Sequence, residues 1–133
     1  MSEHVLIIDD EWTIQRALCA RLSAAGFILR SASHGEAGLR AAREERPDAI
    51  LLDLRMPDMD GFEVFRRLRA DPALATVPVI FLTANVQDTA RQEARTLGAA
   101  GFLCKPYDPK QVIHSLRSAI AGNQALATQG ALT

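Results

Sequence analysis

Short apolar runs alternate with amphipathic segments along the chain. The runs begin near Val5, Phe27, Ala49, Val77 and Gly101. Their spacing of about 22–29 residues is the length of a strand, a helix and two loops. Several runs are continuously apolar, which is typical of central parallel strands covered on both faces. The pattern therefore predicts five strand–helix units in succession.

The segments between the runs have the periodicity of helices with one apolar face. Their ends carry the residue types that start and stop helices: small polar residues that accept hydrogen bonds from free N–H groups, and glycines that leave the helix. The predicted N-caps are Ser33, Asp60 and Asp108, and the predicted stops are Gly26, Gly98 and Gly122.

Strand and helix in strict alternation predict an α/β fold, a doubly wound parallel sheet with helices on both faces. Right-handed crossovers favour the flavodoxin-like (βα)5 strand order 2-1-3-4-5, which places the first and third strands side by side. We expect one domain over residues 1–122. Residues 123–133 are small and polar with little periodicity, and we expect a flexible tail or the start of a linker.

The composition of the chain bears on its size class and on the partners that it can bind. The chain has 133 residues, 48% of them hydrophobic, which suits one domain with a real core. Its 15 basic and 16 acidic residues give a net charge of −1. Without a basic run, this balance predicts no direct contact with nucleic acid and no attraction to an anionic membrane.

Three further features bear on the redox chemistry and the location of the protein. Cys19 and Cys104 fall in predicted core elements and form no CxxC pair, so we expect two buried thiols without a metal or redox role. No apolar stretch approaches the ~20 residues that span a membrane. The N-terminus lacks the pattern of a signal peptide, and we expect a cytoplasmic protein.

Polar residues stand at the ends of four of the five apolar runs. Asp9 and Asp10 end the first run, Asp53 ends the third, Thr83 ends the fourth and Lys105 follows the fifth. The carboxyl ends of parallel strands share one edge of a sheet, where open α/β sheets bind their ligands. Clustered carboxylates repel one another. A Mg²⁺ ion would offset this charge, with Asp10 and Asp53 as ligands and Asp9 holding a coordinated water.

Asp53 also suits covalent chemistry. The loop after it is held by Pro57 and turned by Asp60-Gly61. A carboxylate held in this way can attack phosphorus and form an acyl phosphate. Mg²⁺, the Lys105 ammonium and the Thr83 hydroxyl would then neutralise the new phosphoryl oxygens.

With these motifs the chain resembles the receiver domains of two-component response regulators. The resemblance covers roughly residues 5–122 and rests on Asp9-Asp10, Asp53-x-x-Met56-Pro57-x-x-Asp60-Gly61, Thr83-Ala84 and Lys105-Pro106. It implies that Asp53 accepts a phosphoryl group from a sensor histidine kinase or a histidine phosphotransfer protein. It also implies that the backbone carbonyl of Arg55 is a further Mg²⁺ ligand.

The resemblance further implies a conformational switch. Phe102 stands three residues before Lys105, at the place of the family's switch aromatic, and would turn inward after Thr83 moves toward the phosphate. The fourth helix, fifth strand and fifth helix would then repack and control an output domain, an effector protein or a phosphorylation-dependent homodimer. Arg55 and Asn85 are the expected rate-tuning residues. Such a protein is a switch rather than an enzyme, apart from its own phosphorylation and dephosphorylation.

An alternative function belongs to another class of protein, the phosphatases. Phosphatases of the haloacid dehalogenase type also use a strand-end Asp, a Thr, a Lys and Mg²⁺. Their nucleophile lies on the first strand in an Asp-x-Asp motif, and the triplet here is Asp9-Asp10-Glu11, which departs from that motif at its third position. A pseudo-receiver that only binds partners would have lost an acidic, Thr or Lys position, and all of these are present.

Overall fold

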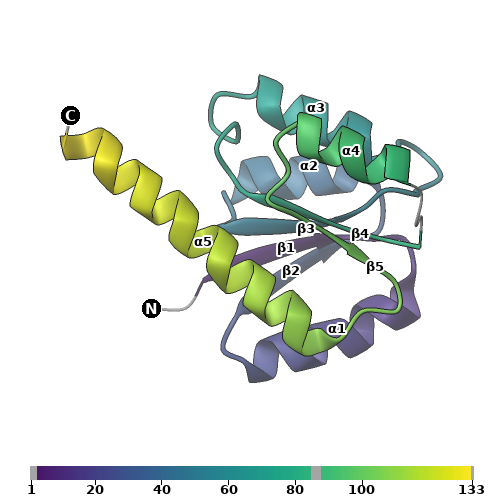
Figure 1. The fold of residues 1–133 in the computed structure, drawn as a ribbon. Helices are drawn as coiled ribbons and strands as arrows, with labels where there is room; N and C mark the ends of the chain where they lie inside the picture. Colours follow the sequence, from purple (N-terminus) through teal and green to yellow (C-terminus); the bar gives the residue numbers. More distant parts are fainter. Residues whose placement is uncertain (1–2, 85–87, 133) are drawn as a thin grey trace.

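Five parallel strands form one sheet in the computed structural model (Figure 1). The structure describes residues 3–84 and 88–132. For residues 12–15, 88 and 124–132 it describes the backbone alone. The strands are β1 (His4–Ile8), β2 (Ile28–Ala32), β3 (Ala49–Asp53), β4 (Val79–Thr83) and β5 (Gly101–Cys104). Their order is β2-β1-β3-β4-β5, which confirms the predicted flavodoxin-like topology.

The helices are α1 (Trp12–Ala24), α2 (Gly35–Glu44), α3 (Gly61–Ala70), α4 (Asp88–Thr96) and α5 (Pro109–Leu132). Helices α2, α3 and α4 cover one face of the sheet, and α1 and α5 cover the other (Figure 1). Strand residues alternate between the two cores: Leu6 and Ile8 pack with α2 and α3, whereas Val5 and Ile7 pack with α1 and α5. The central strands are therefore buried on both sides, as their continuous apolar runs predict.

The strand register brings the predicted polar residues to one edge. Ile8 pairs with Leu52, so Asp9 follows β1 at the level where Asp53 ends β3. Thr83 at the end of β4 pairs with Cys104 at the end of β5, and Lys105 therefore follows β5 just beyond the level of Thr83. The shared edge of the carboxyl ends is a consequence of parallel pairing without a register offset.

Most of the predicted helix ends are confirmed. The Asp60 carboxylate accepts a hydrogen bond from the Glu63 amide at 2.9 Å, and Asp108 does the same for the Lys110 amide at 2.9 Å. Gly26 and Gly98 follow α1 and α4 with φ of 101° and 88°. Only glycine adopts this left-handed backbone freely, so the glycines end these helices.

The predicted cap of α2 at Ser33 is wrong. The N-cap is His34, whose Nδ1 accepts from the Ala37 amide at 3.3 Å. The carboxylate of Asp58, from the loop after β3, accepts from the amides of Gly35 and Glu36 at 3.1 and 3.2 Å. Because a distant carboxylate satisfies these first amides, a capping residue at position 33 is unnecessary.

The expected end of the fifth helix at Gly122 is also wrong. Helix α5 continues to Leu132, and its last turns extend beyond the edge of the sheet (Figure 1). Glycine inside a helix costs about 1 kcal/mol relative to alanine, and the alanines at positions 121, 125 and 127 favour helix on both sides of it. The domain boundary expected at residue 122 is therefore not marked by a break in the helix.

Among the residues that the structure describes, no helix has the combination of length and apolar composition that crossing a bilayer requires.

Candidate functional site

Three charged side chains from three strand ends meet at the carboxyl edge of the sheet. The Lys105 ammonium lies 3.3 Å from Oδ2 of Asp53 and 3.4 Å from Oδ2 of Asp9. Asp9 and Asp53 are each only 3% exposed, and the Lys105 side chain is 10% exposed. The Lys105–Pro106 peptide is cis. The sequence-predicted cluster is therefore present, and its carboxylates are withdrawn from bulk water.

Asp53 is held by the loop that follows it. Its Oδ1 accepts a hydrogen bond from the Arg55 amide at 3.2 Å. The Gly61 amide donates to the Leu54 carbonyl at 2.9 Å, and a Cβ on Gly61 would lie 2.5 Å from the Asp53 carbonyl oxygen. Only glycine permits this close approach, so the start of α3 packs directly against the end of β3. The backbone at the end of β3 is therefore held in place, and the Arg55 amide binds one oxygen of the Asp53 carboxylate.

Burial, hydrogen bonding and neighbouring charges all shift the pKa of Asp53. Burial raises its pKa most strongly, because it disfavours the ionised form. The Arg55 amide and Lys105 lower the pKa, the negative charge of Asp9 raises it, and the result is about 6. Burial lowers the pKa of Lys105. The hydrogen bond to Glu11 and the negative charges of Asp53 and Asp9 raise it by more, so the net shift of the pKa is upward.

The carboxylates also have the geometry of a cation site. One oxygen from each of Asp9, Asp10 and Asp53 lies within 4.8 Å of the others. Asp10 is exposed at the outer side of this group, whereas Asp9 and Asp53 are buried. A set of carboxylate oxygens that is open to water on one side fits Mg²⁺, which prefers oxygen ligands and keeps several waters. The donor set therefore suits the predicted ion.

Thr83 and Phe102 connect this edge to α4 and β5. Thr83 is fully buried at the end of β4, and its carbonyl accepts a hydrogen bond from the Lys105 amide at 2.6 Å. Phe102 is partly buried, with its ring 6.4 Å from that of Phe81, centroid to centroid. The guanidinium of Arg91 lies 5.2 Å from the Phe102 ring centroid. Phe102 thus packs between the core and a cation on the surface.

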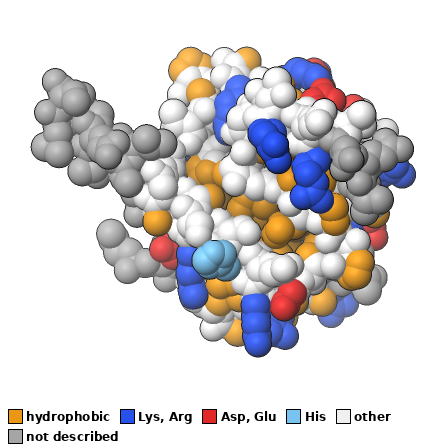
Figure 2. Space-filling view, in the orientation of Figure 1, with side chains coloured by type: hydrophobic (Ala, Val, Ile, Leu, Met, Phe, Trp, Pro, Cys, Tyr) orange, Lys and Arg blue, Asp and Glu red, His pale blue; other side chains and the backbone are white. Residues whose placement is uncertain are grey.

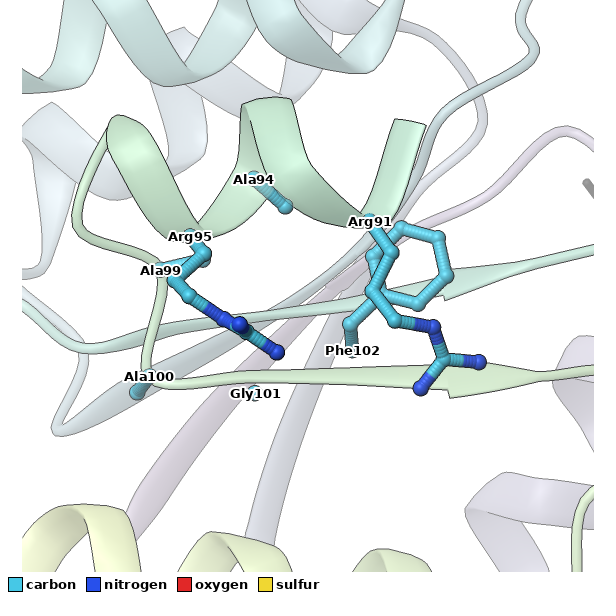
Figure 3. A pocket seen from close by; sticks show the side chains of 7 residues that line it. All are labelled: Arg91, Ala94, Arg95, Ala99, Ala100, Gly101 and Phe102. Carbon is cyan, nitrogen blue, oxygen red and sulfur yellow. The ribbon is translucent and has the colours of Figure 1, made fainter. Parts of the chain in front are cut away.

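A pocket of about 240 Å³ lies next to this aromatic ring. Figure 3 shows the Phe102 side chain directed from β5 toward α4, with Arg91 alongside it and Arg95 on the other side of the pocket. The lining residues are Arg91, Ala94, Arg95, Ala99, Ala100, Gly101 and Phe102. The small side chains around Phe102 leave space beside the ring.

Sequence reasoning missed two residues of this site. Glu11 binds the Lys105 ammonium at 2.9 Å, and its only sequence signal is its position directly after Asp9-Asp10. Tyr107 has a buried hydroxyl without a hydrogen-bond partner among the described residues, and burial raises its pKa to about 12. Of the predicted residues, Arg55 is exposed beside Asp53, and Asn85 lies outside the described residues.

Comparison with known proteins identifies the family. A profile of the response regulator receiver domain matches residues 5–117. The transcriptional regulatory protein KdpE of Mycobacterium tuberculosis is 40% identical over 123 residues, which cover 92% of this chain and 53% of KdpE. Protein PilH of Pseudomonas aeruginosa is 34% identical over 118 residues, which cover 89% of this chain and 98% of PilH.

A solved receiver domain has the same fold. The receiver domain of the sensor histidine kinase PA1611 from Pseudomonas aeruginosa PAO1, solved with a magnesium ion coordinated in its active site cleft, superposes with a TM-score of 0.83. It is 30% identical, and the match covers 91% of this chain and 99% of that one.

The chain spans about half the length of the transcriptional regulators that it matches. None of these relatives supports the haloacid dehalogenase alternative. The matched segment includes every strand end described above, and the chain belongs to the response regulator receiver domain family.

Proposed function

We propose that this receiver takes a phosphoryl group onto Asp53 from a sensor histidine kinase or a histidine phosphotransfer protein. The observation that supports this proposal most directly is the buried Asp53 carboxylate, which accepts a hydrogen bond from the Arg55 amide and lies 3.3 Å from the Lys105 ammonium. In the transfer, the P–N bond of the phosphohistidine breaks and a P–O bond to Asp53 forms. The histidine nitrogen keeps the electron pair and takes up a proton.

Asp10, Asp53 and the backbone carbonyl of Arg55 are the proposed protein ligands of Mg²⁺, with Asp9 acting through a water. The ion would neutralise charge on the carboxylates and the phosphoryl oxygens. The mutual approach of the Asp9, Asp10 and Asp53 oxygens supports this assignment. The Arg55 amide, which donates to Asp53, keeps the backbone of Arg55 next to the site.

Lys105 and Thr83 are the proposed residues that respond to the phosphoryl group. Lys105 already contacts Asp53 and would bind a phosphoryl oxygen, and the Thr83 hydroxyl would bind another. Movement of Thr83 leaves space at the end of β4, into which Phe102 turns. The Phe102 ring would then leave the guanidinium of Arg91, which it faces in this structure.

The face formed by α4, β5 and α5 is the proposed output surface. Figure 2 shows hydrophobic side chains gathered over β5 between α4 and α5, with Lys and Arg side chains nearby. Repacking of Phe102 changes this face, because the ring forms one wall of the pocket beside α4. A downstream effector, an output domain or a second phosphorylated copy would bind there.

We further propose the extent of the domain, the class of its partners and its location. Residues 1–122 are the proposed receiver domain, and residues 123–133 are the proposed C-terminal tail or start of a linker. The partners are proteins rather than nucleic acid or membrane, and the location is the cytoplasm. Receivers are signalling switches, and the chemistry proposed here is limited to phosphorylation and dephosphorylation of the receiver itself.

Intact mass spectrometry after incubation with acetyl phosphate and Mg²⁺ tests the assignment. The wild-type chain should gain one phosphoryl group, and Asp53→Asn should gain none. Thr83→Ala keeps the acceptor and should still gain the group. An adduct that persists in Asp53→Asn but disappears in Asp9→Asn would contradict the proposal and favour a first-strand nucleophile.

A further inference from the structure

Glu11 has the shortest contact with Lys105 in the site. Its Oε1 lies 2.9 Å from the Lys105 ammonium, compared with 3.3 Å for Asp53 and 3.4 Å for Asp9. The Glu11 side chain is 51% exposed, whereas both aspartates are buried. Glu11 therefore holds the ammonium from the solvent side of the cluster.

The Glu11 side chain binds Lys105 and does not cap the helix that Glu11 precedes. Glu11 is the N-cap residue of α1, yet its side chain makes no capping hydrogen bond. A carboxylate at a helix N-terminus is ordinarily stabilised by the free N–H groups and the helix dipole. In Glu11, the backbone N–H instead donates to Oδ1 of Asp9 at 2.8 Å, and the carboxylate accepts a hydrogen bond from the Lys105 ammonium. One residue thus orients both a buried carboxylate and the ammonium.

Lys105 cannot keep all of these contacts when the site is phosphorylated. An ammonium has three N–H donors, and three carboxylates approach it here. A phosphoryl group on Asp53 would replace the Oδ2 contact with phosphoryl oxygens, and each further phosphoryl oxygen that reaches the ammonium would displace Asp9 or Glu11. Glu11 is the partner that is lost at the smallest cost, because its half-exposed carboxylate is readily hydrated, whereas Asp9 is buried.

We infer that Glu11 is a positioning residue that holds Lys105 in the unphosphorylated site and releases it to the incoming phosphoryl group. The inference rests on the proposed function of Asp53 as acceptor. Glu11 competes with the phosphoryl group for the same ammonium, and this competition lowers the affinity of the site for the group. Removing the Glu11 charge should therefore tighten binding of a phosphoryl analogue.

The first test is a titration with beryllofluoride in the presence of Mg²⁺. Glu11→Gln should reduce the half-saturating concentration about two- to fivefold, the effect of one exposed ion pair. Glu45→Gln is the matched control, because Glu45 is 53% exposed and pairs with His4 at 3.1 Å, away from the Asp53 site. Equal affinities for wild type and Glu11→Gln would overturn the inference.

A double-mutant cycle separates positioning from simple repulsion of an anion. If Glu11 acts through Lys105, Glu11→Gln should have no effect on beryllofluoride binding in a Lys105→Met background. An effect that persists in that background would show that Glu11 repels the anion directly, and would overturn its role as a positioning residue.

A metal-free measurement tests the resting contact by itself. The side-chain ammonium resonance of Lys105 should be visible by NMR in the wild type, because its hydrogen bonds slow exchange with water. It should broaden in Glu11→Gln and remain in Glu45→Gln, and an unchanged resonance in Glu11→Gln would contradict the inference. A wild type that shows this signal but takes no phosphoryl group would instead contradict the proposed function.

Discussion

The ammonium of Lys105 lies 3.3 Å from the carboxylate of Asp53, although 52 residues separate them in the sequence and β4 lies between their strands. The contact joins the end of β3 to the end of β5 across the edge of the sheet. It compensates only part of the cost of burying Asp53, whose pKa stays at about 6. In the absence of a metal ion, the ionised Asp53 is therefore a local source of instability.

The first prediction concerns this instability. The folded-state pKa of Asp53, about 6, exceeds its ordinary value of 3.8, so the folded protein binds more protons than the unfolded chain between these values. The contribution of Asp53 to stability is fully present below about pH 4 and is lost as the pH rises through about 6. Asp53→Asn lacks this titration, so its stability relative to the wild type should increase over that range.

Urea unfolding in EDTA at a series of pH values measures this difference. The gap between the two proteins should widen from pH 4 to pH 6 and stay constant above about pH 7. Added Mg²⁺ should reduce the gap at neutral pH, because the ion binds the ionised wild-type site. A gap that does not depend on pH would contradict the raised pKa of Asp53.

The second prediction concerns the junction of β3 and α3. A methyl group on Gly61 would lie 2.5 Å from the Asp53 carbonyl oxygen and 2.8 Å from Leu54 Cα. Both neighbours are backbone atoms, so Gly61→Ala should cost about 1–3 kcal/mol of stability by urea unfolding. A methyl group on Gly122, in α5, would have no heavy atom within 4 Å, so Gly122→Ala should instead raise the free energy of unfolding by about 0.5–1 kcal/mol. Equal effects at the two positions would refute the close packing at Gly61.

The third prediction concerns the surface pair at the switch aromatic. The Arg91 guanidinium over the Phe102 ring should contribute about 0.5–1 kcal/mol, as other exposed cation–π pairs do. Arg91→Ala should lower the free energy of unfolding by that amount. Arg95→Ala is the control, because Arg95 lines the same pocket from the same helix and its guanidinium lies over no aromatic ring among the described residues. The pair would have no stabilising role if both variants unfolded alike.

The fourth prediction concerns Arg55. Its side chain is exposed beside Asp53, where its charge can bind a phosphoryl oxygen or obstruct an attacking water. Arg55→Ala should therefore hydrolyse its phosphoryl group faster than the wild type, by about threefold if one exposed charge contact is lost. Loss of the adduct with time, followed by mass spectrometry, gives the rate. Arg43→Ala, on α2, removes the same charge elsewhere, and an unchanged rate in Arg55→Ala would disprove the tuning role.

The sequence predicted those features that depend on local pattern and on parallel pairing. Asp9, Asp53 and Lys105 follow apolar runs, and any parallel sheet without a register offset brings such positions together. The caps at Asp60 and Asp108 accept hydrogen bonds from amides two or three residues away, so their signal lies within one short segment.

Features that depend on distant side chains could not be predicted in this way. Helix α2 begins at Gly35 because the carboxylate of Asp58, 23 residues later in the chain, accepts a hydrogen bond from the Gly35 amide. Glu11 reaches Lys105 across 94 residues, and only the folded site distinguishes it from an ordinary exposed glutamate. The continuation of α5 through Gly122 is a local effect instead, because the flanking alanines favour helix and outweigh the cost of one glycine.

Phosphoryl chemistry at Asp53 is proposed to change the packing of α4 and β5. Amide NMR spectra recorded with Mg²⁺, before and after addition of beryllofluoride, measure this change at each residue. We predict large shifts at Thr83, Phe102 and Arg91 in the wild type, and none of them in Asp53→Asn. Shifts confined to Asp9, Asp10 and Asp53, with α4 and β5 unchanged, would contradict it.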